Sequence, residues 1–404
     1  MWRSFAWVVV LLVACSASAH KEQSLDALVN ERLGLMRDVA AYKWHRQLDI
    51  EDRQREAEVL RRSVQEALTL GVTPVSAEGF FRAQIEAAKA VQSHWFARWA
   101  AGEPSAPKDA VPDLVSETRP RLMDLGARIL AAAASGYGGA SLTLTVEGVD
   151  GQTAARLQEA ARGLRLFAHR LEQIRATGEL RVGTTGDYAP FTHRGSAAEP
   201  FAGIDVEMAM DLADALGVRP VFVPTSWPTL MEDLSAGRFD IAMGGVSITA
   251  ERRRVGYFSI PYYSGGKTPI ALCAQAARFG TLAEIDSPGV RVIVNPGGTN
   301  ERFIRASLRR AEVVMHPDNR TIFEEILAGR ADVMITDRIE VALQSSRQPR
   351  LCGTMDRTLN HQDKAYLLPT DNPWKRYVDD WLYQRLRSGR VNALFRAHGV
   401  RLVH

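Results

Sequence analysis

The pattern of apolar residues changes once along the chain, near residues 173–178, and this change constrains the fold more than any other feature. From residue 20 to about residue 172, apolar residues recur at the three- and four-residue spacing of amphipathic helices. After Gly178, short β-rich runs alternate with helical stretches, which is typical of a mostly parallel sheet. These runs are residues 180–182, 220–223, 241–243, 290–294 and 333–335. The sequence therefore predicts a helical domain over residues 20–172 and an α/β domain over residues 173–404.

The first 19 residues have the features of a secretory signal peptide. An apolar run over residues 5–13 is followed by the small residues of 17–19, which form a cleavage site before His20. The run is too short to span a bilayer. As an alternative, residues 12–15 resemble a lipoprotein box in which Cys15 would be lipidated. Both alternatives place the mature protein in the periplasm or outside the cell.

The cysteine count and the composition narrow the classes of protein further. If Cys15 is removed or acylated, Cys273 and Cys352 remain, and an even number in an oxidising compartment predicts a disulfide between them. Two buried free thiols are the alternative. The chain is 46% hydrophobic and 24% charged with a net charge of +3, and no basic stripe with interleaved aromatic residues indicates nucleic-acid binding. No Cys/His spacing indicates a metal site, so we expect neither a metal nor a cofactor.

Two carboxylates follow a predicted buried strand at residues 333–335. Asp337 and Glu340 lie where a polar turn opens a helix, and ligands in open α/β folds bind at the carboxyl ends of strands. At this spacing both side chains share one helix face and look into the same cleft. One ionised acid would hold a ligand's ammonium group, whereas an acid kept protonated by apolar surroundings would donate a proton. The alternative for Glu340 is a first-turn acid that complements the helix dipole.

Polar residues at helical spacing in the first domain suggest a pocket for a compact dianion. Arg32 and Lys43 are eleven residues apart, about three turns, so they point the same way. Asp49 is the expected N-cap of the next helix, and Asp52, Arg55 and Glu56 share a face of that helix. Two further candidates are Gln92 on the third helix and Arg119 at the start of the fourth. The alternative is a solvated face, because this segment is rich in arginine.

The helical domain resembles the secreted, gamma-type chorismate mutases. The likeness covers about residues 22–170 and rests on Glu-Arg-Leu at 31–33, Ala-Tyr-Lys-Trp at 41–44 and Gln-Leu-Asp-Ile-Glu-Asp at 47–52. It implies an all-helical enzyme that rearranges chorismate to prephenate by holding the compact conformer and stabilising charge on the ether oxygen. By this likeness Arg32, Arg55 and Arg119 hold the two carboxylates of the substrate. Lys43 and Gln92 then donate to the ether oxygen, and Asp52 and Glu56 hold the ring hydroxyl.

The α/β domain resembles the periplasmic amino-acid-binding proteins, in which two lobes close on a ligand. The likeness rests on segments such as residues 185–191, 203–207 and 249–252. It implies that Arg252 pairs with the ligand carboxylate, assisted by Thr299 at a helix N-terminus. It also implies that the chain crosses between the lobes near Thr268 and again near Leu367.

Within that superfamily, residues 172–390 resemble cyclohexadienyl dehydratase through four motifs in order. They are Val-Pro-Thr-Ser-Trp-Pro at 223–228, Gly-Lys-Thr-Pro-Ile at 266–270, Val-Asn-Pro-Gly-Gly-Thr-Asn-Glu at 294–301 and His-Pro-Asp-Asn at 316–319. The resemblance implies that Glu340 is the general acid at the departing hydroxyl, that Trp227, Lys267 and Asn295 line the pocket, and that Asp337 orients it or meets an ammonium group. Alternatively, Trp227 belongs to a lobe core and Lys267 is a surface charge beside the hinge.

The two resemblances predict consecutive reactions, because prephenate is the product of the first and the substrate of the second. A tether would keep the intermediate near its next site. We therefore expect a bifunctional enzyme that converts chorismate to prephenate and then prephenate to phenylpyruvate without a cofactor. The resemblance adds the conversion of arogenate to phenylalanine as a further reaction of the second domain. The rival hypothesis is a solute-binding protein for an amino acid or aromatic acid, with an inert or regulatory helical domain.

Overall fold

Two units with separate hydrophobic cores divide the chain between Phe167 and Ala168 in the computed structural model, which describes residues 23–137 and 142–400. The sequence placed this division between residues 172 and 173. The predicted signal peptide and the alternative lipidation site at Cys15 lie outside the described residues. Across the described part of the chain, no helix combines the length and the apolar character needed to cross a membrane.

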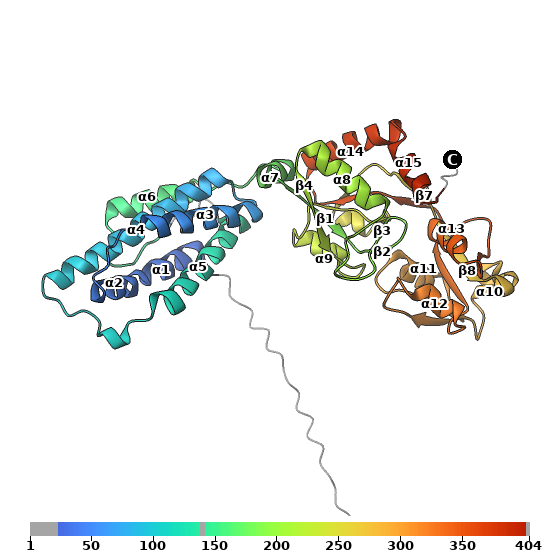
Figure 1. Ribbon diagram of the computed structural model, residues 1–404, viewed down its shortest axis with the longest axis horizontal. Helices are drawn as coiled ribbons and strands as arrows, with labels where there is room; N and C mark the ends of the chain where they lie inside the picture. The colour runs from blue at the N-terminus through green and yellow to red at the C-terminus, as the bar shows by residue number, and fades with distance from the viewer. Residues whose placement is uncertain (1–22, 138–141, 401–404) are drawn as a thin grey trace, which may run out of the picture. The chain divides into compact units, whose positions relative to one another are not determined.

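The first unit is built of α-helices that run alongside one another (Figure 1). In its described residues they are α1 (Leu25–Gly34), α2 (Met36–His45), α3 (Arg53–Thr69), α4 (Pro74–Ala100), α5 (Arg119–Ala132) and α6 (Gly151–Arg162). The long helix α4 packs against α2, α3 and α6, and α1 packs against α5. Phe80 and Phe81 of α4 and Ile129 of α5 are buried in this core. Three short helical turns connect the long helices: Lys108–Ala110, Leu114–Thr118 and Ala133–Tyr137.

The start of α3 corrects one prediction from the sequence. Asp52 is the N-cap, and its carboxylate accepts a hydrogen bond from the backbone N–H of Arg55 at 3.0 Å. The prediction that Asp49 caps this helix was wrong, because residues 48–52 form a loop and the helix begins only at Arg53. Several acids lie together in this loop, and a cap is stable only for the acid whose side chain reaches the free N–H groups of the first turn.

The second unit consists of two α/β lobes. The sheet of lobe 1 has the order β4-β1-β5-β14-β6, and the sheet of lobe 2 has the order β10-β9-β11-β8-β12. The strands of lobe 1 are β1 (Glu179–Thr184), β4 (Arg219–Pro224), β5 (Ile241–Ala242), β6 (Tyr257–Phe258) and β14 (Leu367–Leu368). Those of lobe 2 are β8 (Lys267–Leu272), β9 (Arg291–Val294), β10 (Glu312–Met315), β11 (Val333–Asp337) and β12 (Leu351–Gly353). In each sheet three neighbouring strands are parallel, and the rest are antiparallel.

Helices cover both sheets and bring the end of the chain back to lobe 1. The helices of lobe 1 are α7 (Arg170–Thr177), α8 (Ile204–Leu216), α9 (Leu230–Ser235), α14 (Asn372–Arg387) and α15 (Arg390–Ala397). In Figure 1 the red helices α14 and α15 lie beside the green helix α8, and α15 contacts α8. The helices of lobe 2 are α10 (Leu282–Ile285), α11 (Thr299–Ser307), α12 (Ile322–Leu327) and α13 (Arg338–Arg347).

Two short strands connect the lobes. The chain passes from β6 to β8 through β7 (Tyr263–Gly265), and it returns from β12 to β14 through β13 (Gln362–Lys364). These two strands pair antiparallel, with Lys364 opposite Tyr263. The lobe crossings that the sequence placed near Thr268 and Leu367 agree with this hinge, so residues at the hinge end of lobe 2 lie close to both lobes.

A disulfide joins Cys273 to Cys352. Cys273 follows β8 directly, and Cys352 lies on β12, which pairs antiparallel with β8. This is the pair that the cysteine count predicted. The bond fastens the edge strand of lobe 2 to its neighbour.

Candidate active sites

One cavity in the helical unit brings together all seven residues that the sequence predicted there. It has a volume of about 150 Å³, and apolar residues such as Met36, Val39 and Leu122 complete its wall. The predicted residues come from the five helices α1 to α5: Arg32, Lys43, Asp52, Arg55, Glu56, Gln92 and Arg119. An all-helical bundle thus directs cations, two acids and an amide toward one space.

Arg32 is the cation of this cavity that most needs a ligand. Its side chain is 7% exposed, and burial lowers its pKa to about 10. Its Nε and Nη1 atoms have no hydrogen-bond partner among the described residues. A buried guanidinium without a partner is costly, and a carboxylate in the cavity would supply one.

Lys43 and Gln92 supply further donors. The ammonium of Lys43 donates to the backbone oxygen of Ile50 at 2.7 Å, and burial lowers its pKa. The Gln92 amide nitrogen donates to the backbone oxygen of Ala88 at 3.1 Å, and its amide oxygen has no partner in the described part of the chain. Both groups can donate to a neutral or anionic oxygen, and neither needs an acidic pH to do so.

The three residues at the start of α3 already contact protein groups. Asp52 caps the helix, and its backbone N–H donates to the carboxylate of Glu56 at 3.2 Å. Arg55 forms an ion pair with Glu58 at 2.6 Å. Glu56 lies 3.5 Å from the ammonium of Lys89, a cavity residue that the sequence reasoning missed. Its position on α4, one turn before Gln92, was the available signal, because residues at this spacing share a helix face.

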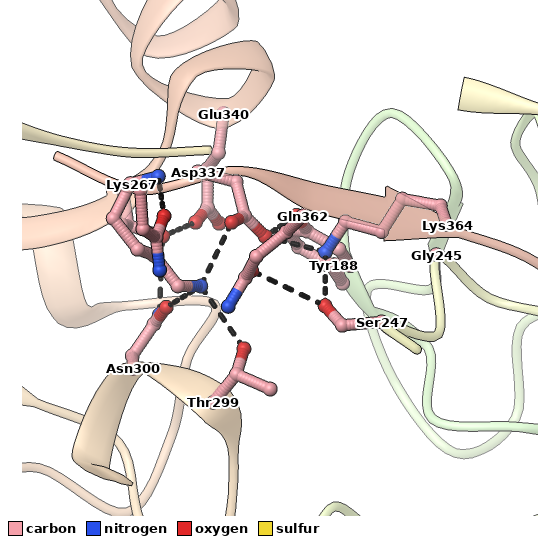
Figure 2. A network of polar contacts seen from close by, with 12 residues as sticks. Tyr188, Gly245, Ser247, Lys267, Thr299, Asn300, Asp337, Glu340, Gln362 and Lys364 are labelled. Carbon is pink, nitrogen blue, oxygen red and sulfur yellow. Dashed lines mark hydrogen bonds and ion pairs between the residues drawn. The ribbon is translucent and has the colours of Figure 1, made fainter. Parts of the chain in front are cut away.

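A second site lies at the hinge of the second unit, where Asp337 forms ion pairs with two lysines. The register of β11 and β8 places Asp337 opposite Lys267, and their charged atoms are 2.8 Å apart. Lys364, the last residue of β13, approaches the other carboxylate oxygen to 2.6 Å. Figure 2 shows the two lysines reaching Asp337 from opposite sides. Tyr188 of lobe 1 donates its hydroxyl hydrogen to the same carboxylate, so Asp337 links both lobes.

The surroundings of Asp337 keep it ionised. Burial by itself opposes ionisation, but the ammonium groups of Lys267 and Lys364 outweigh it, so the pKa of Asp337 lies well below its ordinary value. Burial lowers the pKa of Lys364 to about 8, although Asp337 stabilises its charge. Lys267 is fully buried and donates to the Thr299 hydroxyl at 3.0 Å. The alternative reading of Lys267 as a surface charge was therefore wrong.

Glu340, in the first turn of α13, differs from Asp337 in its charge state. Its side chain is 2% exposed, and burial raises its pKa to about 7, with a further contribution from the nearby charge of Asp337. The carboxyl group accepts a hydrogen bond from Thr336. In Figure 2 it lies beside the Asp337 network. A carboxyl group with this pKa is half protonated near neutral pH and can act as an acid.

The predicted residues of this domain line two adjoining hollows. Five of them line the cleft between the lobes: Trp227, Arg252, Asn295, Thr299 and Asp337. Glu340 lies on the wall of a neighbouring cavity together with Asp187, and Asn319 lines both hollows. Lys267 lies behind Asp337, outside the lining of the cleft.

Arg252 and Trp227 form the wall of the cleft on the lobe 1 side. Arg252 is 2% exposed, burial lowers its pKa to about 10, and its Nε has no partner among the described residues. Its Nη1 donates to the backbone oxygen of Ser247 at 3.0 Å. Trp227 is half-buried, donates its indole N–H to Asp187 at 3.1 Å and packs edge-on against Tyr188. It therefore belongs to both the packing of lobe 1 and the cleft.

Five polar side chains of the cleft were missed by the sequence reasoning: Tyr188, Ser247, Asn300, Asn319 and Lys364. The available signal for Lys364 was its position, because the predicted return crossing near Leu367 places it at the hinge.

Within the described residues, no group of three or more His, Cys, Asp and Glu side chains is arranged to hold a metal ion.

Comparison with known proteins relates each unit to a family. Residues 22–93 match chorismate mutase type II, and residues 180–400 match the bacterial extracellular solute-binding proteins, family 3. A cyclohexadienyl dehydratase from Pseudomonas aeruginosa is 54% identical over 231 residues, which cover 57% of this chain and 86% of the relative. The L-cystine-binding protein TcyJ of Escherichia coli is 26% identical over 226 residues, covering 55% of this chain and 84% of the relative.

A solved structure supports the same fold for the second unit. The ancestral amino acid-binding protein AncCDT-1, described as a precursor of cyclohexadienyl dehydratase, matches with a TM-score of 0.53 and 32% identity. The match covers 56% of this chain and 98% of that structure. The two-lobed architecture is thus shared with both a binding protein and the lineage of an enzyme.

Proposed function

Because the chain belongs to family 3 of the bacterial extracellular solute-binding proteins and carries a chorismate mutase type II match ahead of that region, we propose that it is a bifunctional enzyme. The helical unit rearranges chorismate to prephenate. The two-lobed unit converts prephenate to phenylpyruvate, with arogenate as a second possible substrate. The protein acts in the periplasm or outside the cell, in keeping with the extracellular family and the predicted export signal.

The helical unit has the groups that the rearrangement requires. Arg32, Arg55 and Arg119 hold the two carboxylates, while Lys43 and Gln92 donate to the ether oxygen as its bond breaks. Asp52 and Glu56 hold the ring hydroxyl, which donates its one hydrogen to one of the two carboxylates. The reaction is unimolecular, so fixed geometry and donors aimed at the developing charge supply the rate enhancement. The unpartnered, buried guanidinium of Arg32 is the observation that supports an anionic ligand in this cavity.

The two-lobed unit has an acid beside a cationic cleft, and this supports dehydration. Prephenate carries two negative charges, takes up one proton and yields carbon dioxide, water and the phenylpyruvate anion. Glu340 delivers that proton to the departing hydroxyl. Arg252 and Thr299 hold a carboxylate, and Trp227, Asn295 and Asp337 orient the ring and side chain, with Lys267 holding Asp337 in place. The observation that carries this step is the buried Glu340 with its pKa raised to about 7.

The rival is a solute-binding protein, which the fold and the likeness to a cystine-binding protein favour. Purified protein supplied with chorismate alone tests both hypotheses. The bifunctional enzyme forms phenylpyruvate, which is followed by its ultraviolet absorbance, and prephenate passes through as a transient. Tight binding of phenylalanine in calorimetry, without turnover of chorismate or prephenate, would support the receptor.

Paired variants separate the two sites. Glu340→Gln removes the proton but keeps the shape, and we expect it to lower the dehydratase kcat by about 10²- to 10⁴-fold while mutase activity is unchanged. Lys43→Ala should do the reverse, lowering mutase kcat by about 10²-fold or more. Each variant is the folding control for the other, because the unaffected activity reports an intact protein. Parental dehydration by Glu340→Gln, or parental mutase activity in Lys43→Ala, would remove that residue from its role.

A further inference from the structure

Glu340 borders a cavity that is larger than the cleft between the lobes. The cavity has a volume of about 320 Å³, against about 30 Å³ for the cleft, so it has room for several water molecules at about 30 Å³ each. Asn319 lines both hollows, and its side-chain N–H donates to the backbone oxygen of Asp187 in lobe 1 at 2.9 Å. Asn319 therefore forms part of the wall between the two hollows, and a ligand in the cleft need not fill the cavity.

The proposed dehydration uses one proton of Glu340 in every turnover. Glu340 gives this proton to the departing hydroxyl, which leaves as water, and its own carboxylate remains ionised. The ionised form is unfavourable there, because the side chain is buried and Asp337 and Asp187 add negative charge nearby. A new proton must therefore arrive from solvent before the next turnover. The cavity offers an approach, since its lining includes the exposed residues Arg320 and Arg347.

Two titratable residues of lobe 1 line the same cavity. Asp187 lies on β2 (Asp187–Tyr188) and His193 on β3 (Thr192–His193), and the antiparallel register places these two residues directly opposite each other. Opposed residues project from the same face of a strand pair, with Cβ atoms about 5 Å apart. Besides burial, the charge of Asp187 raises the pKa of Glu340, so these two carboxyl groups are close. The Nδ1 atom of His193 has no hydrogen-bond partner among the described residues. The three groups thus form a series along the cavity.

The surroundings bring the acid strengths of the three groups closer together. Burial raises the pKa of Asp187 above that of an ordinary aspartate. Burial lowers the pKa of His193, and the nearby Arg347 and His398 lower it further. The pKa of Glu340 is raised by burial to about 7. A proton moves readily between groups of similar pKa, because neither direction of transfer is strongly unfavourable.

We propose that Asp187 and His193, together with water in the cavity, form the route by which Glu340 regains its proton after each turnover. His193 takes up a proton from solvent and releases one through water to Asp187, which passes it to Glu340. Each group returns to its starting state, so the route delivers the one proton that the overall reaction consumes. This inference rests on the proposed dehydratase function, and it gives a proton-transfer role to two residues outside the lining of the cleft.

The test separates kcat from kcat/KM for prephenate in the whole chain, at neutral pH and low buffer concentration. His193→Ala should lower kcat by about tenfold and leave kcat/KM within about twofold, because the proton is regained after the irreversible loss of carbon dioxide. Added imidazole should restore kcat in a concentration-dependent manner, since it replaces the lost side chain. His398→Ala is the matched control. It should leave both constants unchanged, because His398 contacts Glu207 at 2.7 Å and does not line the cavity.

A second variant, Asp187→Asn, keeps a hydrogen-bond acceptor for Trp227. It should also lower kcat by about tenfold. The double variant of Asp187→Asn with His193→Ala should be no slower than Asp187→Asn alone, because residues that act in series do not contribute additively. Unchanged kcat/KM in these variants reports an intact second unit.

Three results would overturn the proposal. They are an unchanged kcat in both single variants, equal losses of kcat and kcat/KM that imidazole does not reverse, and fully additive losses in the double variant. Equal losses of both constants would indicate a structural role. A working dehydratase that gives any of these results loses the proton route alone. If the parental protein turns over no prephenate, the dehydratase function itself fails and the route fails with it.

Discussion

Asp337 and Glu340 are separated by one helical turn, yet their neighbours give them opposite charge states. Burial favours the neutral form of both. Two ammonium groups reverse this at Asp337, while Glu340 has a hydroxyl partner and a nearby negative charge. Neighbouring carboxyl groups whose pKa values are pushed apart divide into a fixed charge and a proton donor. The fixed charge at Asp337 therefore helps to create the acid at Glu340.

This division predicts the pH dependence of the dehydratase. Only protonated Glu340 can donate, and its pKa is about 7. We expect kcat/KM for prephenate to be constant well below pH 7 and to fall about tenfold for each pH unit well above it. Measurements of initial rates across this range test the prediction. The mutase reaction of the same protein is the internal control at pH values where the ammonium of Lys43, whose pKa burial lowers, stays protonated. The neutral amide of Gln92 has no proton to lose.

A dehydratase profile that stays level from pH 6 to 9, or that rises, would contradict the assignment of Glu340.

The position of this acid could be predicted from the sequence, because it follows a strongly apolar strand and such a strand is expected to be buried. The sequence did not disclose Lys364. Its approach to Asp337 depends on a cross-lobe hinge that brings together residues far apart in the chain, and a lone lysine directly after Gln362 and Asp363 gives no sign of burial.

At the scale of elements, the disulfide between Cys273 and Cys352 closes a long loop in lobe 2, with a sequence separation of 79 residues. It holds the edge strand β12 against β8, whose first residue is Lys267. We expect the double variant Cys273→Ser with Cys352→Ser to lower the free energy of unfolding of the second unit by about 2–4 kcal/mol. Denaturant titration followed by tryptophan fluorescence measures this change.

The same loss of stability should follow reduction of the parental protein, and the reducing agent should leave the double variant unaffected. An identical midpoint of unfolding in the parental and double-variant proteins would show that the disulfide contributes little. Mutase activity should be unchanged throughout, because the helical unit has a separate core.

The elements themselves were predictable to different degrees. The run of Val333 to Ile335 is apolar, with β-branched residues at both ends, and it forms the first three residues of β11. The crossing strands β7 and β13 are only three residues long and were not predictable, since pairing with a distant segment creates them. At the start of α3, several acids compete for the cap, and the path of the preceding loop decides in favour of Asp52.

At the scale of the whole molecule, the two units are expected to work independently. The helix α7 belongs to the second unit, because the Arg170 backbone N–H donates to Asp371 at 2.5 Å and its guanidinium lies 3.5 Å from Asp240. We expect fragments 20–167 and 168–404 to keep mutase and dehydratase activity respectively. A fragment that starts at residue 173 loses these contacts and should unfold at a lower temperature than fragment 168–404.

Thermal unfolding and separate activity assays on the fragments test this prediction. Equal unfolding temperatures for the two versions of the second unit would place the division after α7. Loss of one activity on separation would show that the units depend on each other. When chorismate is the only substrate, the whole chain should release less free prephenate than an equimolar mixture of fragments, because the tether raises the local concentration of the intermediate.

The bond from Tyr188 of lobe 1 to Asp337 of lobe 2 is made by the chain's own side chains. A transport receptor signals occupancy to its membrane partner through a difference in conformation between its ligand-free and ligand-bound states. A contact between the lobes that needs no ligand reduces that difference. Such a contact would weaken signalling by a receptor, but it suits an enzyme, because it keeps the active-site groups aligned from one turnover to the next.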